Sequence, residues 1–78
     1  MEFTLEELQC LRKTMARLIA ENEYTIEKQE QMFPDYVALY NSPSFQERLQ
    51  RRELLAGLTA KIVDYEVEKR LQTKILMN

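Results

Sequence analysis

Residues 33–45 read Phe33-Pro34-Asp35-Tyr36-Val37-Ala38-Leu39-Tyr40-Asn41-Ser42-Pro43-Ser44-Phe45, a segment that holds both prolines of the 78-residue chain and four of its aromatic residues. A proline disfavours helical geometry in the residue before it, so this segment interrupts any helix that enters it. The stretches on either side lack proline, and Gly57 is their only glycine. We therefore predict an all-α fold of one domain, an antiparallel hairpin of two long helices over about 4–32 and 44–77, with a connector over 33–45.

The first helix has a clear start and one apolar side. Thr4 and Glu7 have the spacing of a capping box, in which each side chain bonds the backbone amide of the other residue. Asn22 and Gln29 continue the line of the apolar side, where a polar residue can fix the register of packed helices. The alternative is that the apolar side simply becomes more exposed to solvent toward this end of the helix. The apolar residues that share this side are Leu8, Leu11, Met15, Leu18, Ile19 and Ile26.

The connector carries more apolar area than an exposed loop should display. Pro34 suits the first position of a short helix that stops near Asn41, and Ser42-Pro43 or Ser44 can start the second long helix. The aromatic residues can plug the end of the hairpin, or they can contact a partner, because tyrosine offers large contact area at little entropic cost. Both interpretations hold if one group points inward and the other outward: Phe33, Leu39 and Phe45 inward, Tyr36 and Tyr40 outward.

The second helix is apolar on two sides. One side holds Leu54, Leu55, Leu58, Ile62, Tyr65 and Leu76, and the other, rotated by roughly 120–180°, holds Phe45, Leu49, Ala56, Ala60, Val63, Val67, Leu71 and Ile75. The first helix can cover only one side, so we expect another chain to cover the other. A homodimer that forms a four-helix bundle is the most economical solution. The predicted oligomer face is Leu49, Ala56, Ala60, Val63, Val67, Leu71 and Ile75.

Gly57 leaves two possibilities for the second helix. Beside Ala56 and Ala60, it can permit the close approach of another helix. It can equally end a shorter helix and let the chain bend, which would give a three-helix domain.

The basic residues gather at the start of the second helix. Arg48, Arg51 and Arg52 lie close together in sequence, interrupted by Glu47 and Glu53. This cluster is a solvated face, a patch for an acidic protein partner, or a contact for nucleic acid. A formal net charge of −2 argues against a general nucleic-acid binder.

Composition excludes several kinds of chemistry. The chain has no histidine, which excludes Cys/His zinc sites and histidine acid–base catalysis, and Cys10 has no second cysteine to pair with. We expect Cys10 to be a small buried residue in a reducing compartment. Asp64 and Glu68 lie one helical turn apart without a third ligand, so we expect no metal, no cofactor and no catalytic residues.

These observations predict a small non-catalytic protein that binds another protein as a regulator, inhibitor or adaptor. The N-terminal residues lack the pattern of a signal peptide and no apolar run reaches membrane-spanning length, so we expect a cytoplasmic protein. Two alternatives remain: a self-associating structural or assembly subunit, and a small dimeric DNA-binding regulator. The predicted partner-binding residues are Tyr36, Tyr40, Arg48, Arg51 and Arg52.

Overall fold

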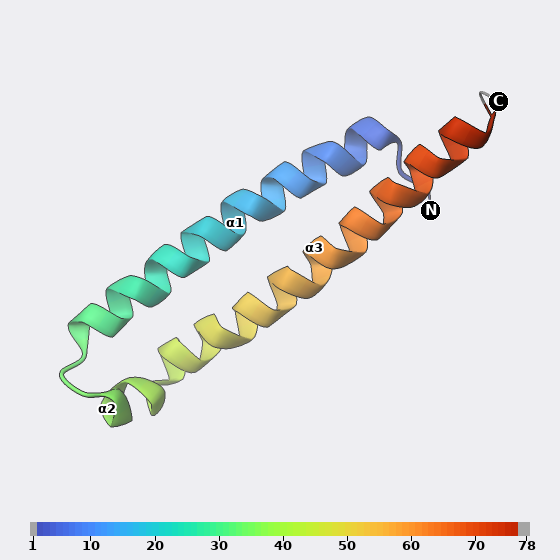
Figure 1. Ribbon diagram of the computed structural model, residues 1–78. Coiled ribbons are helices and arrows are strands. Elements are labelled where there is room, and N and C mark those ends of the chain that lie inside the picture. The colour runs from blue at the N-terminus through green and yellow to red at the C-terminus, as the bar shows by residue number, and fades with distance from the viewer. Residues whose placement is uncertain (1, 77–78) are drawn as a thin grey trace.

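Two long helices lie side by side in opposite directions, and a short helix joins them at one end (Figure 1). The computed structural model describes residues 2–76, with side chains through residue 74. Helix α1 is Leu5–Met32, α2 is Tyr36–Tyr40 and α3 is Pro43–Leu76. The molecule measures 60 × 18 × 15 Å. The all-α prediction is confirmed for these residues, which contain no strand, and the two long helices are arranged as a hairpin.

The ends of α1 follow from local sequence. The Thr4 amide donates to Glu7 Oε1 at 2.9 Å and the Glu7 amide donates to Thr4 Oγ1 at 3.1 Å, which completes the predicted capping box. The Thr4 amide also lowers the pKa of the Glu7 carboxyl, because it bonds the charged form. At the other end, Phe33 has extended backbone before Pro34, and α1 therefore stops at Met32.

The short helix begins later than the sequence pattern predicted. Pro34 does not start it; α2 begins at Tyr36, and Asp35 is the N-cap, whose carboxylate accepts from the Ala38 amide at 2.7 Å. A capping carboxylate satisfies an amide that would otherwise lack a partner, and this bond places the start of the helix at Tyr36. Helix α3 then begins at Pro43, the earlier of the two expected starts.

The main core lies at the connector end and joins all three helices. Ile26 of α1, Leu39 of α2 and Phe45 of α3 are buried together, and Phe33 and Leu49 pack against them. The inward set of the connector is therefore the one that the sequence predicted, and this cluster closes the end of the hairpin.

Away from the connector, the line of α3 that faces α1 is largely polar. We call this line the seam. Its residues alternate at spacings of four and three, the pattern that keeps one side of a helix against a neighbour. Leu55 is buried there, Ile62 and Thr59 are half-buried, and Glu66 is 5% exposed. The seam consists of Arg48, Arg52, Leu55, Thr59, Ile62 and Glu66.

Polar side chains also set the register of α1 against α3. Asn22 is 2% exposed; its Nδ2 donates to the Arg48 carbonyl at 3.1 Å, and the Arg48 guanidinium donates to Asn22 Oδ1 at 3.4 Å. About two turns nearer the connector core on α1, Gln29 Nε2 donates to Ser44 Oγ at 2.7 Å. Asn22 and Gln29 thus bond α3 of the same chain across the helix pair.

The structure decides between the two alternatives for Gly57 and corrects the expectation for Cys10. Helix α3 continues through Gly57, and a Cβ built there would meet no atom within 4 Å, so Gly57 neither ends the helix nor allows a close approach within this chain. Cys10 is exposed, and the expectation of a buried thiol was wrong. Cys10 follows Leu8 by two positions, which turns it about 200° away from the buried line.

Within residues 2–76, no three Cys, Asp or Glu side chains gather as a metal site would require. None of the three helices is long and apolar enough to cross a membrane.

Candidate protein-binding site

The outer side of α2 carries a compact apolar surface, which we call the connector patch: Tyr36, Val37 and Tyr40. Their exposed fractions are 74%, 72% and 52%. The two tyrosine rings lie one helical turn apart with their centroids separated by 6.5 Å. Tyr40 also meets Phe45 edge to face, with a centroid distance of 5.4 Å. Tyr40 is therefore partly anchored to the core, whereas Tyr36 and Val37 extend into solvent.

The backbone under the connector patch is fixed by hydrogen bonds. Besides the Asp35 cap, the Asn41 amide donates to the Val37 carbonyl and the Ser42 amide donates to the Leu39 carbonyl. The Gln46 side chain donates to the Tyr40 carbonyl and ties α2 to α3. Because the backbone is already ordered, a partner that binds the patch loses little conformational entropy.

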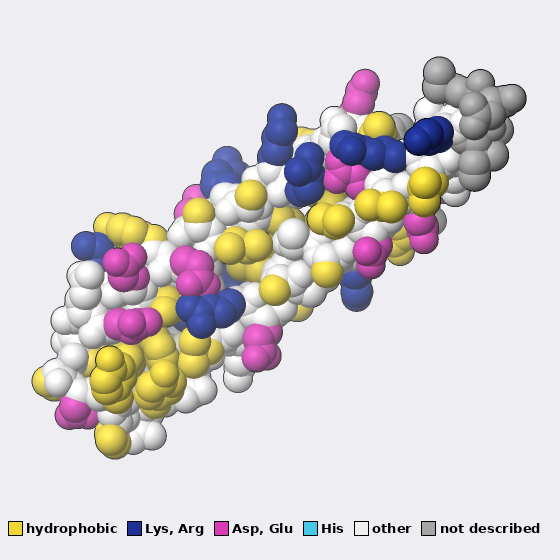
Figure 2. Space-filling model, viewed as in Figure 1, with side chains coloured by type: hydrophobic (Ala, Val, Ile, Leu, Met, Phe, Trp, Pro, Cys, Tyr) yellow, Lys and Arg dark blue, Asp and Glu magenta, His cyan; other side chains and the backbone are white. Residues whose placement is uncertain are grey.

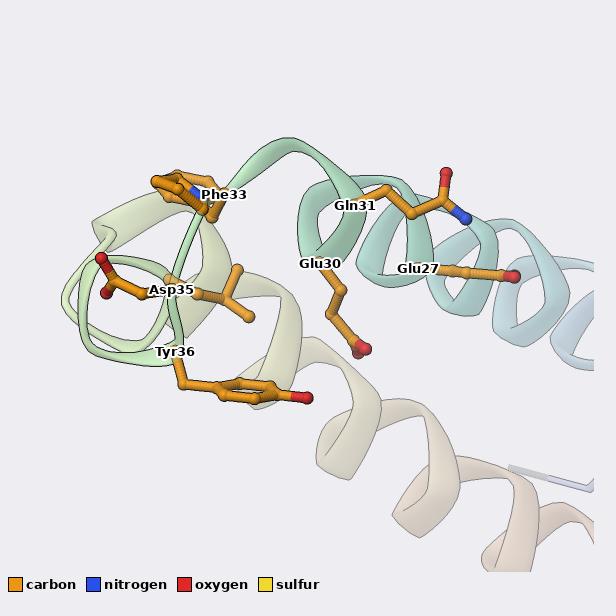
Figure 3. A pocket seen from close by; sticks show the side chains of 8 residues that line it. Glu27, Glu30, Gln31, Phe33, Asp35 and Tyr36 are labelled. Atoms are coloured by element: carbon orange, nitrogen blue, oxygen red, sulfur yellow. The ribbon is translucent and has the colours of Figure 1, made fainter.

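An open pocket of about 380 Å³ lies beside the patch, between the end of α1 and α2. Figure 3 shows the Glu30 side chain and the Tyr36 ring extending from different elements toward this space, while Asp35 points away. Phe33 and Leu39 form the apolar part of the pocket wall, and Glu27 lines the pocket with a carboxylate in addition to that of Glu30. The pocket is large enough to admit a side chain from another molecule.

The three predicted arginines do not join the patch as one site. Arg52 forms two hydrogen bonds to the Glu23 carboxylate, at 2.6 and 2.7 Å, and Arg48 is bonded to Asn22. Arg51 lines a separate hollow between α1 and α3, together with Leu18. Arg48 and Arg52 thus hold the hairpin together, and only Arg51 makes no side-chain bond to the described chain.

The Glu23–Arg52 pair shifts both groups toward their charged forms. The hydrogen bond from Arg52 lowers the pKa of the Glu23 carboxyl, and the hydrogen bond to Glu23 raises the pKa of Arg52. Nearby Glu30 and Tyr40 also favour the charged guanidinium. Both side chains are nearly half exposed, so water and salt weaken the attraction.

The pair makes the stability of the hairpin depend on pH, with a loss of stability in acid. Because the folded pKa of Glu23 lies below its model value of 4.5, its contribution is fully present above that value and is lost as the pH falls through the folded pKa. We expect Glu23→Gln to lower the free energy of unfolding at neutral pH by less than about 1 kcal/mol. Urea unfolding followed by circular dichroism gives the free energy of unfolding at each pH, and this free energy should fall less steeply toward acid for the variant than for the unchanged chain. An equal fall in both proteins would contradict the role of the pair.

The predicted oligomer face lies mainly on one flank of the seam. Ala56, Ala60, Val63, Val67 and Leu71 are exposed there. Leu49 is instead partly buried against the connector core, and the side chain of Ile75 lies outside the described residues. Leu54, Leu58 and Tyr65, which the sequence placed on the other apolar side, are exposed on the opposite flank. The seam therefore runs between the two exposed flanks of α3 and takes Leu55 and Ile62 from the first apolar side.

No protein-family model, curated protein or solved structure matches this chain. Its function must therefore be inferred from the connector patch and the exposed flanks of α3.

Proposed function

We propose that this chain is a small non-catalytic protein-binding module, a regulator, inhibitor or adaptor that acts as a homodimer in the cytoplasm. The observation that carries the proposal is the connector patch. Helix α2 has only five residues, yet it buries Leu39 and turns Tyr36 and Val37 outward on a fixed backbone. An ordered helix with an uncovered apolar outer side is a surface suited to a protein partner.

The energetics of the connector patch favour binding. Removing a large apolar side chain from water contributes about 1.5–3 kcal/mol. Nearly three quarters of Tyr36 and of Val37 is exposed, so most of this free energy is still available to be gained when a partner covers them. Tyrosines on a rigid support are common anchors of protein interfaces, and the adjoining pocket provides a place for a side chain of the partner.

A second candidate function, a self-associating structural subunit, is favoured by a different observation. Val67 and Leu71 are half exposed on one flank of α3, outside the connector patch. A structural subunit would use this flank, and the connector patch as well, only to contact copies of itself. The two candidates differ in what happens when the patch alone is changed.

The decisive variant is Tyr36→Ser, with Tyr24→Ser as a matched control. Tyr24 is also largely exposed, on α1, where it lies beside the Lys28 ammonium. Tyr40 is a poorer choice because its ring packs on Phe45. We expect Tyr36→Ser to reduce capture of the partner from a native cell extract at least about tenfold, since an interface anchor is worth 1.4 kcal/mol or more. Tyr24→Ser should capture it as the unchanged chain does.

Quantitative mass spectrometry of the captured proteins measures the result, and circular dichroism checks that the helices persist. Equal capture by both variants would show that the patch is not the binding site. If Tyr36→Ser captures as much partner as the unchanged chain but forms a smaller oligomer, the patch is a self-association contact and the second candidate holds.

A further inference from the structure

One face of the hairpin combines small apolar residues from both long helices. We call it the alanine–valine face: Ala16 and Ala20 of α1 with Ala56, Ala60, Val63 and Val67 of α3. All six side chains are exposed, Val67 to 50%. Val63 and Val67 line one groove with Arg12, which places the two helices on a common surface there. Figure 2 shows hydrophobic side chains running along the molecule between groups of charged ones.

The face is positive at the end away from the connector. Arg12 Nε lies 3.0 Å from Glu66 Oε2, and Arg70 Nη2 lies 3.1 Å from Glu66 Oε1. Two guanidinium groups thus share one buried carboxylate, and the cluster keeps a net positive charge. Both arginines border the groove with Val63 and Val67 and remain about half exposed. Lys13 lies seven residues before Ala20, on the same side of α1, and adds another exposed cation.

The same face is negative at the connector end. Arg12, Glu23 and Glu30 are about three and five turns apart, so they follow one line along α1. Glu23 is matched one to one by Arg52, but Glu27 and Glu30 add two carboxylates without an ion-pair partner among the described residues. The charge along the face therefore changes sign from end to end, with the alanines between.

We infer that a second copy of this chain covers the alanine–valine face in the opposite direction, so that the connector end of each copy lies on the far end of the other. This inference rests on the proposed homodimer and specifies its interface. The exchange of ends brings Arg12 and Lys13 of one copy toward Glu27 and Glu30 of the other, which is electrostatically complementary. Pairing like ends would instead set Arg12 against Arg70 of the second copy.

The dimensions of the face suit such an interface. The hairpin measures 60 by 18 Å, so one whole side of it offers on the order of 1,000 Å², against about 800 Å² per partner in an interface of standard size. The twofold axis crosses the face near Ala20 and Ala60, where short side chains let helix backbones approach closely. On the opposite flank, Arg51 and Glu21 line the same hollow, so charges of both signs lie together there.

The first test asks which flank is covered. We expect light scattering of the unchanged chain to give twice its 9.4-kDa mass. Val67→Glu should give the mass of one chain at the same concentration, with its helicity retained. Leu54→Glu, an equally drastic change on the opposite exposed flank, should leave the mass doubled. A monomeric unchanged chain overturns the inference, and so does a dimer that is broken only by Leu54→Glu.

The second test asks for the direction of the two copies. Lys13→Glu and Glu27→Lys should each weaken self-association on the order of five- to tenfold, because each places like charges opposite one another twice. Mixed in equal amounts, the two variants should form mixed dimers in preference to either homodimer. The variant that carries both changes should regain the original affinity.

Random mixing of the two charge variants would overturn the antiparallel arrangement even if the dimer itself is present. Native mass spectrometry distinguishes the mixed dimer from both homodimers when one variant is isotopically labelled. The Val67→Glu result is independent of the Tyr36→Ser experiment, whereas Glu27 also lines the pocket beside the connector patch. A dimer that shows all of them, yet captures its partner equally well without Tyr36, would refute the connector patch and leave the dimer interface intact.

Discussion

Phe45→Ala is expected to lower the free energy of unfolding by about 3–5 kcal/mol, the range for removal of a buried aromatic side chain. Phe45 is 2% exposed at the point where all three helices meet. Its loss leaves Ile26 and Leu39 beside a cavity and removes the ring on which Tyr40 packs. Native proteins are stable by only about 5–15 kcal/mol in total, so the variant should lose a large fraction of its stability.

Urea unfolding followed by circular dichroism measures the loss, at one fixed chain concentration because self-association adds to stability. Leu58→Ala is the control: Leu58 is 39% exposed on α3, and its truncation should cost under about 1 kcal/mol. If the two variants are equally stable, the connector core does not hold the helices together.

Arg12→Met combined with Arg70→Met is expected to destabilise the chain by a similar 3–5 kcal/mol, because it leaves a buried carboxylate without a partner. Glu66 is only 5% exposed, and these two arginines are its ion-pair partners in the described chain. Adding Glu66→Leu should restore most of the lost stability, since a buried ion cluster replaced by apolar side chains is often neutral or stabilising.

The measurement is again urea unfolding, with all variants carrying Val67→Glu so that dimer formation does not contribute. Arg17→Met with Lys61→Met removes the same number of cations from exposed positions and should change little. A double variant as stable as this control would mean that Glu66 is well solvated. Failure of Glu66→Leu to recover stability would mean that the arginines matter through their packing.

The parts of the fold that sequence could predict depend on neighbours in the chain. The capping box at Thr4 and the break at Pro34 are local patterns, and both have the expected consequence for α1. The side of α3 that faces α1 could not be predicted in the same way. Apolar periodicity points to the flanks, whereas the seam includes Arg52 and Glu66, which become suitable interior residues only through Glu23 and Arg12 of α1.

The candidate site shows the same limit. The outward direction of Tyr36 and Tyr40 was predicted, but Val37 was missed, although it adjoins Tyr36 and lies away from buried Leu39. Arg48, Arg51 and Arg52 are close in sequence, and this proximity alone predicts a single basic site. Successive residues of a helix point about 100° apart, so proximity along α3 did not place these three side chains together.

The position of the core at the connector also sets an order of folding. The bonds between α1 and α3 close loops of increasing length, from a separation of 15 residues at Gln29–Ser44 to 26 at Asn22–Arg48 and 29 at Glu23–Arg52. Shorter loops lose less entropy on closure, so we expect the helix pair to form from the connector outward. We expect the far end to close last and to open first, and the Arg12–Glu66–Arg70 cluster is the contact that forms in the final step.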